Sequence, residues 1–169
     1  MLKSAIILAI GNELVEGLIL DTNSKYMSQR LKLAGYYVVR TETLPDNLQI
    51  MKDRISVALQ DADLIITSGG LGPTEDDITR EAVSAVIGRK LIVDKKLSDE
   101  LVQRAIKYYG KSAESVSKQA MIIEGAKVLD NPVGTAPGQL VEVNGKIILI
   151  LPGPPSELIP IFENVYDKI

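Results

Sequence analysis

Glycines and acidic residues occur together in one short segment of this sequence. Residues 67–79 read Thr-Ser-Gly-Gly-Leu-Gly-Pro-Thr-Glu-Asp-Asp-Ile-Thr, and the apolar residues 64–66 precede them. Glycines leave backbone N–H groups uncovered and let phosphate oxygens approach closely. A helix that begins just afterwards adds the positive end of its dipole. Glu75, Asp76 and Asp77 would repel a phosphate, so they indicate a divalent cation between the carboxylates and the phosphate. The segment therefore predicts a site for a phosphorylated ligand.

Two aspartates are the candidate catalytic residues, and each has a structural alternative. Asp77 ends the glycine segment, and Asp46 follows Pro45 after the apolar residues 36–44. Aspartate is also a preferred N-cap at the start of a helix, and both roles can coexist there. Gly-Gly-Leu-Gly is likewise typical of a tight strand-to-helix turn that binds nothing. We expect Asp46 and Asp77 to carry the chemistry, with the cap and the turn as the alternatives.

Composition limits the chemistry that is available. The chain has 169 residues, with no cysteine and no histidine. Disulfides, thiolate or imidazole metal sites and the commonest general base are therefore excluded. Carboxylates, lysines, hydroxyls, backbone amides and an oxygen-bound metal must do any catalysis. A net charge of −3 does not favour nucleic-acid binding. The longest apolar run, residues 5–10, is too short to span a bilayer, so we expect a cytoplasmic protein with no membrane segment.

Apolar runs alternate with helical patterns through the first half of the chain. This alternation predicts an α/β fold, with a parallel sheet covered on both faces by right-handed crossovers. The expected strands are residues 4–10, 36–44 and 64–68. The expected helices begin after a cap at Asp21 or Thr22, after a cap at Asp46 or Asn47, and at Ile78. Residues 11–20 are expected to form a loop.

The second half has a less regular pattern. The dipeptide Asn144-Gly145 favours the positive φ angles of a type I′ turn, so it predicts a β-hairpin. The expected segments are helices at residues 97–109 and 112–121, a weak strand at 127–129, a constrained loop at 131–138, hairpin strands at 139–143 and 146–151, and a last helix capped by Ser156 that ends near Lys168.

Loops that follow parallel strands should meet at one edge of the sheet. In an open α/β sheet, ligands bind beyond the carboxyl ends of the strands, where the strand order reverses. Residues 11–17, 45–47 and 69–77 each follow a predicted strand. Residues 152–157 follow the hairpin, so they join the other loops only if the last hairpin strand runs parallel to the others.

These segments together resemble one family. The chain is similar to the N-terminal domain of CinA-type, competence-damage-inducible proteins, within the wider molybdopterin-binding folds of MoaB, MogA, and one domain of MoeA and gephyrin. The likeness covers essentially the whole chain. The glycine motif is common to the wide group, whereas Asn-Pro-Val-Gly-Thr-Ala-Pro-Gly and Leu-Pro-Gly-Pro-Pro point to CinA. The matching motifs begin at Gly11, Asp21, Leu44, Thr67, Lys118, Asn131 and Leu151.

The resemblance implies a three-layer α/β/α sandwich with a mostly parallel mixed sheet, in a single domain over residues 1–169. It implies that the loops at 69–77 and 152–157 flank an anionic ligand. Because relatives form dimers or trimers, we also expect this chain to form a homo-oligomer, a dimer or a trimer. Acids that match Asp46 and Asp77 are essential in MogA-like proteins, and we expect Asp77 and Glu157 to hold a divalent metal such as Mg²⁺. The candidate ligand-binding residues are Gly11, Glu13, Asn23, Thr67, Ser68, Gly69, Gly70, Gly72, Pro73, Thr74, Lys118, Gly134, Thr135, Gly153, Pro154 and Ser156.

The resemblance also supplies hypotheses about the reaction. The matching CinA domain is associated with metal-dependent ADP-ribose pyrophosphatase activity, whereas MogA-like proteins adenylate molybdopterin. Leu71 stands where MogA has threonine, which removes a hydroxyl and weakens the molybdopterin interpretation. We expect no C-terminal amidohydrolase domain, so deamidation of nicotinamide mononucleotide is not carried over. The first hypothesis is hydrolysis of a nucleoside-diphosphate sugar to AMP and ribose 5-phosphate; the alternatives are molybdopterin binding or adenylation, and a non-catalytic nucleotide-binding module.

Overall fold

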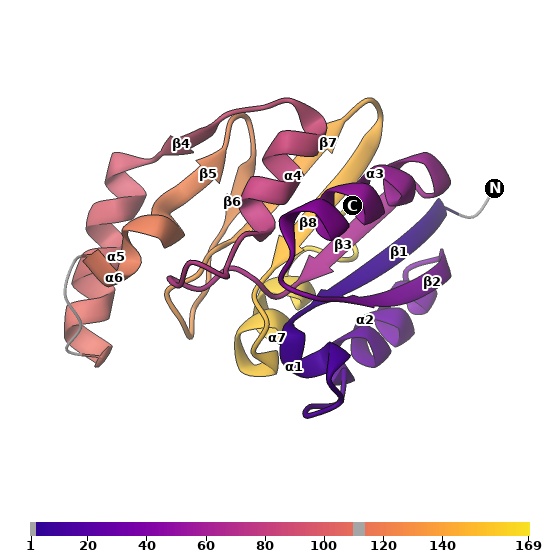
Figure 1. Cartoon of the computed structure of the whole chain (residues 1–169), viewed down its shortest axis with the longest axis horizontal. Coiled ribbons are helices and arrows are strands. Elements are labelled where there is room, and N and C mark those ends of the chain that lie inside the picture. Colours follow the sequence, from indigo (N-terminus) through magenta and orange to yellow (C-terminus); the bar gives the residue numbers. More distant parts are fainter. Residues whose placement is uncertain (1–2, 110–113) are drawn as a thin grey trace.

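A six-stranded sheet forms the centre of the computed structural model, which describes residues 3–109 and 114–169 (Figure 1). The strand order is β2-β1-β3-β8-β7-β6, and β7 alone of these six runs against its neighbours. The predicted mostly parallel mixed sheet is therefore confirmed. The strands are β1 (Lys3–Ile10), β2 (Tyr36–Leu44), β3 (Leu64–Ser68), β6 (Lys127–Leu129), β7 (Gly138–Val143) and β8 (Lys146–Leu151).

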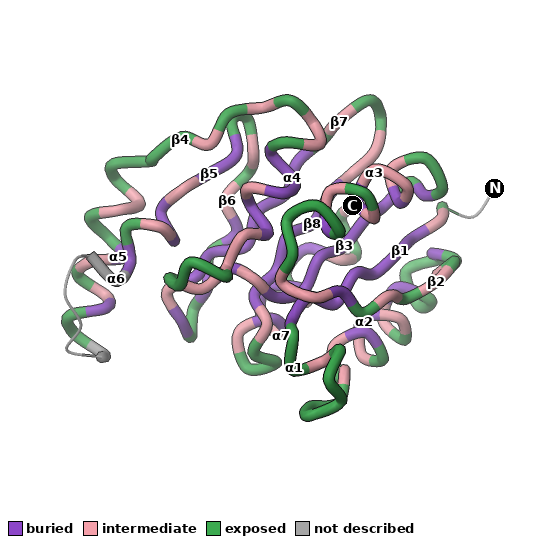
Figure 2. The backbone as a smooth tube through the Cα atoms, in the orientation of Figure 1, coloured by how far each residue is buried: buried purple, intermediate pink, exposed green. Residues whose placement is uncertain are grey.

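Helices cover both faces of this sheet. On one face, α3 (Leu48–Asp61) and α4 (Thr79–Ile87) pack against Ile6, Leu8 and Ile10 of β1. On the other face, α2 (Thr22–Leu33) and α7 (Pro155–Glu163) pack against the alternate β1 residues Ala5 and Ile7. Figure 2 shows that β1 and β3 are buried along most of their length. Burial on both faces explains why these strands are continuous apolar runs.

The strand order reverses beside β1. The chain leaves β1 towards β2 through α2, and it returns through α3 to β3 on the opposite side of β1. Right-handed crossovers in opposite directions place α2 and α3 on opposite faces, as observed. The loops after β1 and β3 therefore diverge, and a crevice is expected between them.

A small second sheet lies at one end of the molecule (Figure 1). It pairs β4 (Leu91–Val93) with β5 (Met121–Ile123) in antiparallel register, beside α5 (Lys95–Tyr109). The predicted helix over residues 112–121 is wrong for its second part, because the chain forms α6 (Glu114–Ser117), a 3₁₀ turn (Lys118–Ala120) and then β5; residues 112–113 lie outside the described residues. The apolar residues of β5 pair with β4, which supplies backbone hydrogen bonds that a helix would compete for.

The local structure differs from the sequence prediction at two places and decides one open alternative. Residues 11–20 contain a short helix, α1 (Asn12–Val15), rather than only a loop. Of the two predicted caps of α3, Asn47 and not Asp46 takes the role, because Asn47 Oδ1 accepts a hydrogen bond from the Ile50 N–H at 3.1 Å. Ser156 does not cap the last helix, which begins at Pro155 and ends at Glu163. Proline suits the first helical position because its φ is preset and it has no N–H to leave unpaired.

Other local predictions are confirmed. Asp21 caps α2 through the Ser24 N–H at 2.9 Å. Asn144 and Gly145 have φ values of 50° and 77°, as the type I′ turn between β7 and β8 requires. Among the described helices, none combines the length and apolar character needed to cross a membrane.

A bidentate ion pair joins α2 to α7. Arg30 Nε and Nη2 donate to the Glu163 carboxylate oxygens at 2.7 and 2.5 Å, and the Tyr26 hydroxyl donates to Glu163 at 2.5 Å. These hydrogen bonds, led by those from Arg30, hold the pKa of Glu163 below its ordinary value. The pair fixes α7, whose first turn follows the proline-rich segment at the crevice.

Replacing Glu163 with glutamine removes the charge that this arrangement uses. We expect the melting temperature at pH 7 to fall by about 2–4 °C. Because the folded pKa of Glu163 lies below its ordinary value of 4.5, its contribution is present above that value and is lost as the pH falls through the folded pKa. The difference from the unchanged protein should therefore shrink in acid. Thermal unfolding at pH 7 and pH 3 measures both effects, with the exposed Glu16→Gln as control; equal melting temperatures at pH 7 would contradict the prediction.

Candidate functional site

A cavity of about 400 Å³ lies at the carboxyl edge of the sheet, where β1 and β3 diverge. Loops that follow β1, β2, β3 and β8 line it. The loop after β8 reaches the cavity because β8 runs parallel to β3. The predicted residues that line it are Gly11, Glu13, Asp46, Gly69, Gly70, Gly72, Pro73, Thr74, Asp77, Thr135, Gly153, Pro154 and Glu157.

Three predicted residues lie behind the cavity wall. Asn23 and Ser68 border an adjoining cavity of about 290 Å³. Asn23 Nδ2 donates to Ser68 Oγ at 3.0 Å and to the Gly153 carbonyl at 2.7 Å, so it ties α2 to the ends of β3 and β8. Thr67 is fully buried in β3, and its hydroxyl has no partner among the described groups. Asn23 and Ser68 therefore hold the loops together, Thr67 is part of the core, and none of the three lines the main cavity.

Two other predicted residues lie on the outside of the site. Lys118 Nζ donates to the carbonyls of Thr74 and Glu75 at 2.7 and 3.3 Å, so it fastens the outer part of the glycine loop. Ser156 is exposed on the first turn of α7. Neither residue lines the cavity.

Three successive carbonyls of the glycine loop are held by the start of α4. The Thr79 hydroxyl donates to the Gly69 carbonyl at 2.9 Å, and the Thr79 N–H donates to the Gly70 carbonyl at 3.2 Å. Arg80 Nη2 donates to the Leu71 carbonyl at 2.5 Å. The carbonyls of all three peptides therefore point towards α4.

The N–H groups of the same three peptides must point the other way. A trans peptide directs its N–H opposite to its C=O, and no described peptide is cis. Gly70, Leu71 and Gly72 supply these N–H groups, and all three residues line the cavity. None of the three N–H groups donates to another described group of the protein. Successive unpaired N–H groups form an anion-binding nest. We call residues 70–72 the amide nest.

Close packing requires glycine in this loop. Gly69 and Gly70 have φ values of 110° and 67°, which other residues rarely adopt. A Cβ on Gly69 would lie 2.2 Å from the Ile10 carbonyl oxygen, and a Cβ on Gly70 would lie 2.1 Å from Thr79 Oγ1. The Gly69 N–H itself donates to the Leu151 carbonyl, so it belongs to the sheet and not to the nest.

Asp46 lies in the cavity wall and does not cap a helix. Its Oδ2 accepts the Asn12 N–H at 2.9 Å, and its own N–H donates to Asn12 Oδ1 at 3.1 Å. Burial raises the pKa of Asp46, the Asn12 N–H opposes that effect, and the nearby charges of Glu13, Asp77 and Asp76 raise it further. The sequence alternative that Asp46 is the cap of α3 is thus wrong.

Asp77 closes the glycine loop on itself. Its Oδ2 accepts the Thr74 N–H at 2.9 Å and the Thr74 hydroxyl at 2.5 Å. Ile78 occupies the N-cap of α4, so Asp77 is not that cap either. A Cβ on Gly72 would lie 2.5 Å from Asp77 Oδ2, which places this carboxylate against the nest.

Glu157 reaches the cavity from α7 and is anchored to the loop that precedes β7. Its Oε2 accepts a hydrogen bond from Asn131 Nδ2 at 2.6 Å. A Cβ on Gly134 would lie 2.1 Å from the same oxygen, and the Gly134 N–H donates to Asn131 Oδ1 at 2.8 Å. Gly134 therefore makes room for Glu157 and does not itself line the cavity.

The carboxylates of the cavity fit a shared cation better than a resident one. No three acidic side chains among residues 3–109 and 114–169 lie close enough together to hold a metal by themselves. Mg²⁺ is often bound by one or two carboxylates together with the phosphates of a substrate. The donor set therefore fits a cation that is held jointly with a phosphorylated ligand. The acids that line the cavity are Glu13, Asp46, Asp76, Asp77 and Glu157.

The cavity has lining residues that the sequence does not predict as ligand-binding. They include Leu71, Asp76 and Gln119, each next to a predicted site residue. Thr79 was within the quoted motif, so its position was available as a signal. Arg80 carried no signal, because a lone arginine in an amphipathic helix is usually exposed.

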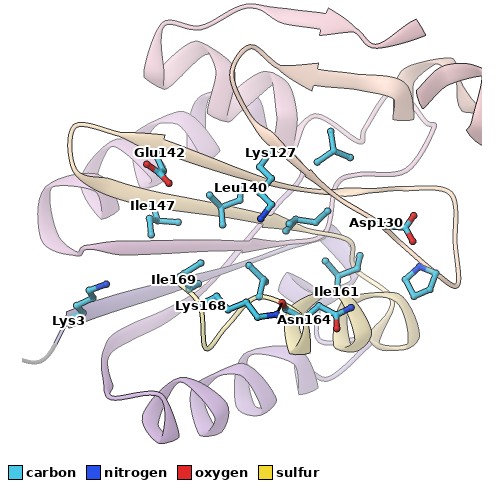
Figure 3. Close-up of a pocket in the computed structure, with 14 residues that line it drawn as sticks. Lys3, Lys127, Asp130, Leu140, Glu142, Ile147, Ile161, Asn164, Lys168 and Ile169 are labelled. Carbon is cyan, nitrogen blue, oxygen red and sulfur yellow. Dashed lines mark hydrogen bonds between the residues drawn. The ribbon is translucent and has the colours of Figure 1, made fainter. Parts of the chain in front are cut away.

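A larger cavity of about 580 Å³ lies elsewhere, between the β6–β7–β8 edge and the C-terminal end of α7. Figure 3 shows that Lys3, Lys127 and Lys168 border it, around apolar residues such as Leu140 and Ile161. None of the predicted site residues lines it, and it has no glycine loop. The smaller cavity is therefore the candidate functional site.

Comparison with known sequences identifies a family. Residues 6–169 match the family described as "Probable molybdopterin binding domain". A CinA-like protein of Fervidobacterium nodosum is 68 % identical over 168 residues, and one of Thermotoga maritima is 46 % identical over 168 residues. Each alignment covers 99 % of this chain and 41 % of the relative, so the chain spans less than half the length of these proteins.

Solved structures share the fold. CinA from Thermoplasma acidophilum, a protein of unknown function, is 36 % identical with a TM-score of 0.86, over 96 % of both chains. A MogA structure is 21 % identical with a TM-score of 0.63, over 98 % of this chain and 95 % of MogA. At the lower identity the likeness shows the fold alone.

Gly70→Ala tests the packing that forms the nest. The new Cβ would collide with Thr79 Oγ1 and disturb the held carbonyls. Gly88→Ala is the matched control, because Gly88 has the same φ of 67° with no atom within 4 Å of the added Cβ. We expect Gly70→Ala to lower the free energy of unfolding by at least about 1 kcal/mol more than Gly88→Ala, which adds left-handed strain alone. Urea unfolding measures this, and equal losses would contradict it.

Asp46→Asn tests the cost to stability of an ionised Asp46 among the other carboxylates of the cavity. The amide oxygen can still accept the Asn12 N–H, while the charge is removed. Since the folded pKa of Asp46 lies above its ordinary value of 3.8, its ionisation destabilises the fold at neutral pH but not below that value. We expect Asp46→Asn to melt at an equal or higher temperature at pH 7 and to show no gain at pH 3. Asp53→Asn on the exposed side of α3 is the control, and a lower melting temperature for Asp46→Asn at pH 7 would oppose this interpretation.

Proposed function

This chain belongs to the family of molybdopterin-binding domains, and we propose that it binds the phosphoryl end of a nucleotide or pterin on the amide nest. One feature carries the proposal: the N–H groups of three successive cavity-lining residues donate to no described group, and the held carbonyls direct them away from α4. Nests of this kind bind phosphate oxygens, and the adjoining start of α4 adds its dipole. The adjoining cavity of about 290 Å³, which Asn23 and Ser68 border, offers largely apolar space for the non-phosphate part of the ligand.

We further propose that the chain hydrolyses the phosphoanhydride of a nucleoside-diphosphate sugar such as ADP-ribose. The amide nest would hold the diphosphate. A water oxygen would attack one phosphorus, the bridging P–O bond would break, and the products would be AMP and ribose 5-phosphate. A divalent ion, with Asp77 and Glu157 as its proposed protein ligands, would supply charge neutralisation and a more acidic water when bound.

Asp46 is the proposed general base. It lines the cavity, and its Oδ2 is held by the Asn12 N–H while its Oδ1 has no hydrogen-bond partner in the described protein. Asp77 and Glu157 are the proposed metal ligands, which leaves Asp46 for proton transfer. Burial raises its pKa, so its carboxylate holds a proton more strongly than an exposed aspartate would. The chain has no histidine, and no lysine lines the cavity among the described residues, so a carboxylate is the proposed base.

Molybdopterin binding or adenylation is the second candidate. The description of the matching family favours it. Leu71 in the nest opposes it, since the side chain is buried and offers no hydroxyl. A non-catalytic domain that binds a nucleotide as a signal would use the same nest without Asp46.

The first test is release of AMP from ADP-ribose by the purified chain with Mg²⁺, Mn²⁺ or Co²⁺. We expect turnover by the unchanged protein and about a hundredfold lower kcat for Asp46→Asn, because a general base typically contributes that much or more. ADP-ribose binding should be retained in this variant, and Asp53→Asn should be fully active.

The remaining outcomes separate the alternatives. No AMP under any metal would exclude the hydrolase. Calorimetric titration of the chain with ADP-ribose and with molybdopterin then shows which ligand the cavity prefers. Tight binding of ADP-ribose that is recovered intact after prolonged incubation would support the non-catalytic module.

A further inference from the structure

A fully buried arginine lies directly behind the amide nest. Arg80 is the second residue of α4, and its side chain has no exposed surface. Its Nη2 donates to the Leu71 carbonyl, whereas Nε and Nη1 have no hydrogen-bond partner in the described part of the chain. Burial lowers the pKa of Arg80 to about 10, with Glu81 and Asp77 opposing that effect, so the guanidinium stays charged at neutral pH.

The cavity itself contains no compensating positive charge. Among the described residues, no lysine or arginine lines it. The Lys118 ammonium is close, but it is held by the carbonyls of Thr74 and Glu75 and lies 3.8 Å from Glu81. An anion that enters therefore faces carboxylates, with the Arg80 guanidinium as a fixed cation bonded to the nest from behind.

We infer that Arg80 is a positioning residue for anion binding, acting through the Leu71–Gly72 peptide. It holds the Leu71 carbonyl, so the Gly72 N–H faces the cavity, and it places a positive charge at the far end of the same peptide. This inference rests on the proposed binding of a phosphoryl group by the nest.

Two physical effects act through this peptide. An anion on the Gly72 N–H would form a hydrogen-bond chain that continues through the Leu71 carbonyl to Arg80, and each bond in such a chain polarises the next. The guanidinium is also buried, where its field is screened less than at the surface. Arg80 can thus attract an anion that it never touches.

The cost to stability supports a functional role. A buried charge with two unpaired nitrogens is unfavourable, and replacing such groups with apolar side chains of similar size is often neutral or stabilising. If Arg80 were needed only for folding, its replacement would lower the melting temperature. If Arg80 serves anion binding, its replacement lowers the affinity for the anion while the melting temperature stays equal or rises.

The test compares Arg80→Met, Arg80→Lys and Arg89→Met. Arg89 is the matched control because its Nη2 also donates to a backbone carbonyl, that of Glu142 at 2.6 Å, away from the cavity. We expect Arg80→Met to bind inorganic pyrophosphate with Mg²⁺ at least about tenfold more weakly by calorimetry, since hydrogen bonds to charged groups have effects of this order. Arg80→Lys, which keeps the charge, should recover part of the affinity, and Arg89→Met should bind as the unchanged protein does.

Amide NMR gives a readout that a merely structural role would not change. In the unchanged protein, pyrophosphate should shift the N–H signals of Gly70, Leu71 and Gly72. In Arg80→Met the Gly72 response should be the most reduced, while the folded spectrum and the melting temperature are retained.

The outcomes distinguish a failure of the proposed phosphoryl binding from a failure of the role of Arg80. No pyrophosphate binding and no nest shifts in the unchanged protein would overturn the proposed function, and this inference with it. Normal binding by Arg80→Met would overturn only the role of Arg80. Weak binding together with a lower melting temperature and no recovery in Arg80→Lys would also overturn it, because that pattern is the one a structural residue produces.

Discussion

The orientation of three consecutive peptides is the constraint on which the candidate site depends. Thr79 and Arg80 hold the carbonyls of Gly69, Gly70 and Leu71, so the N–H groups on the opposite side of the same peptides are left for a ligand. The planar trans peptide makes each N–H point away from the carbonyl that α4 holds. The start of α4 therefore acts from behind the loop, and the cavity in front is lined by donors that have no other partner in the described protein.

The site combines these donors with a negatively charged wall. Five carboxylates line the cavity, and burial with their mutual repulsion raises the pKa of Asp46. Such a wall would repel a phosphate unless positive charge is supplied. The anchored acids Asp77 and Glu157 suit a cation shared with the ligand, and the buried Arg80 suits a fixed charge behind the loop. Phosphate donors and cation ligands within one cavity are consistent with phosphoanhydride chemistry, as proposed.

Family membership and fold agree, but they do not identify the reaction. The chain matches CinA-like proteins at high identity over 99 % of its length, whereas its likeness to MogA at 21 % identity concerns the fold alone. The same sheet edge can serve different chemistry because the loops, not the strands, contact the ligand. The identity of residue 71 illustrates this: the leucine is buried in the core cluster beside the nest and brings no hydroxyl to the cavity that it helps to line.

The sequence by itself determined the layered α/β fold, the β7–β8 hairpin and the glycine loop, because apolar periodicity and turn residues are local properties. It could not decide whether Asp46 caps α3 or lines the cavity, because Asp46 and Asn47 are both suitable caps. Only the tertiary structure shows that Asn47 accepts the Ile50 N–H and so caps the helix. The short strands β4 and β5 were also missed, because they pair with each other across α5 and α6, and a contact between segments so far apart in the sequence leaves no local pattern. The burial of Arg80 was likewise decided by tertiary structure. The glycine loop folds back over the start of α4, where the Leu71 carbonyl accepts a hydrogen bond from Arg80, and no local sequence pattern records such a contact.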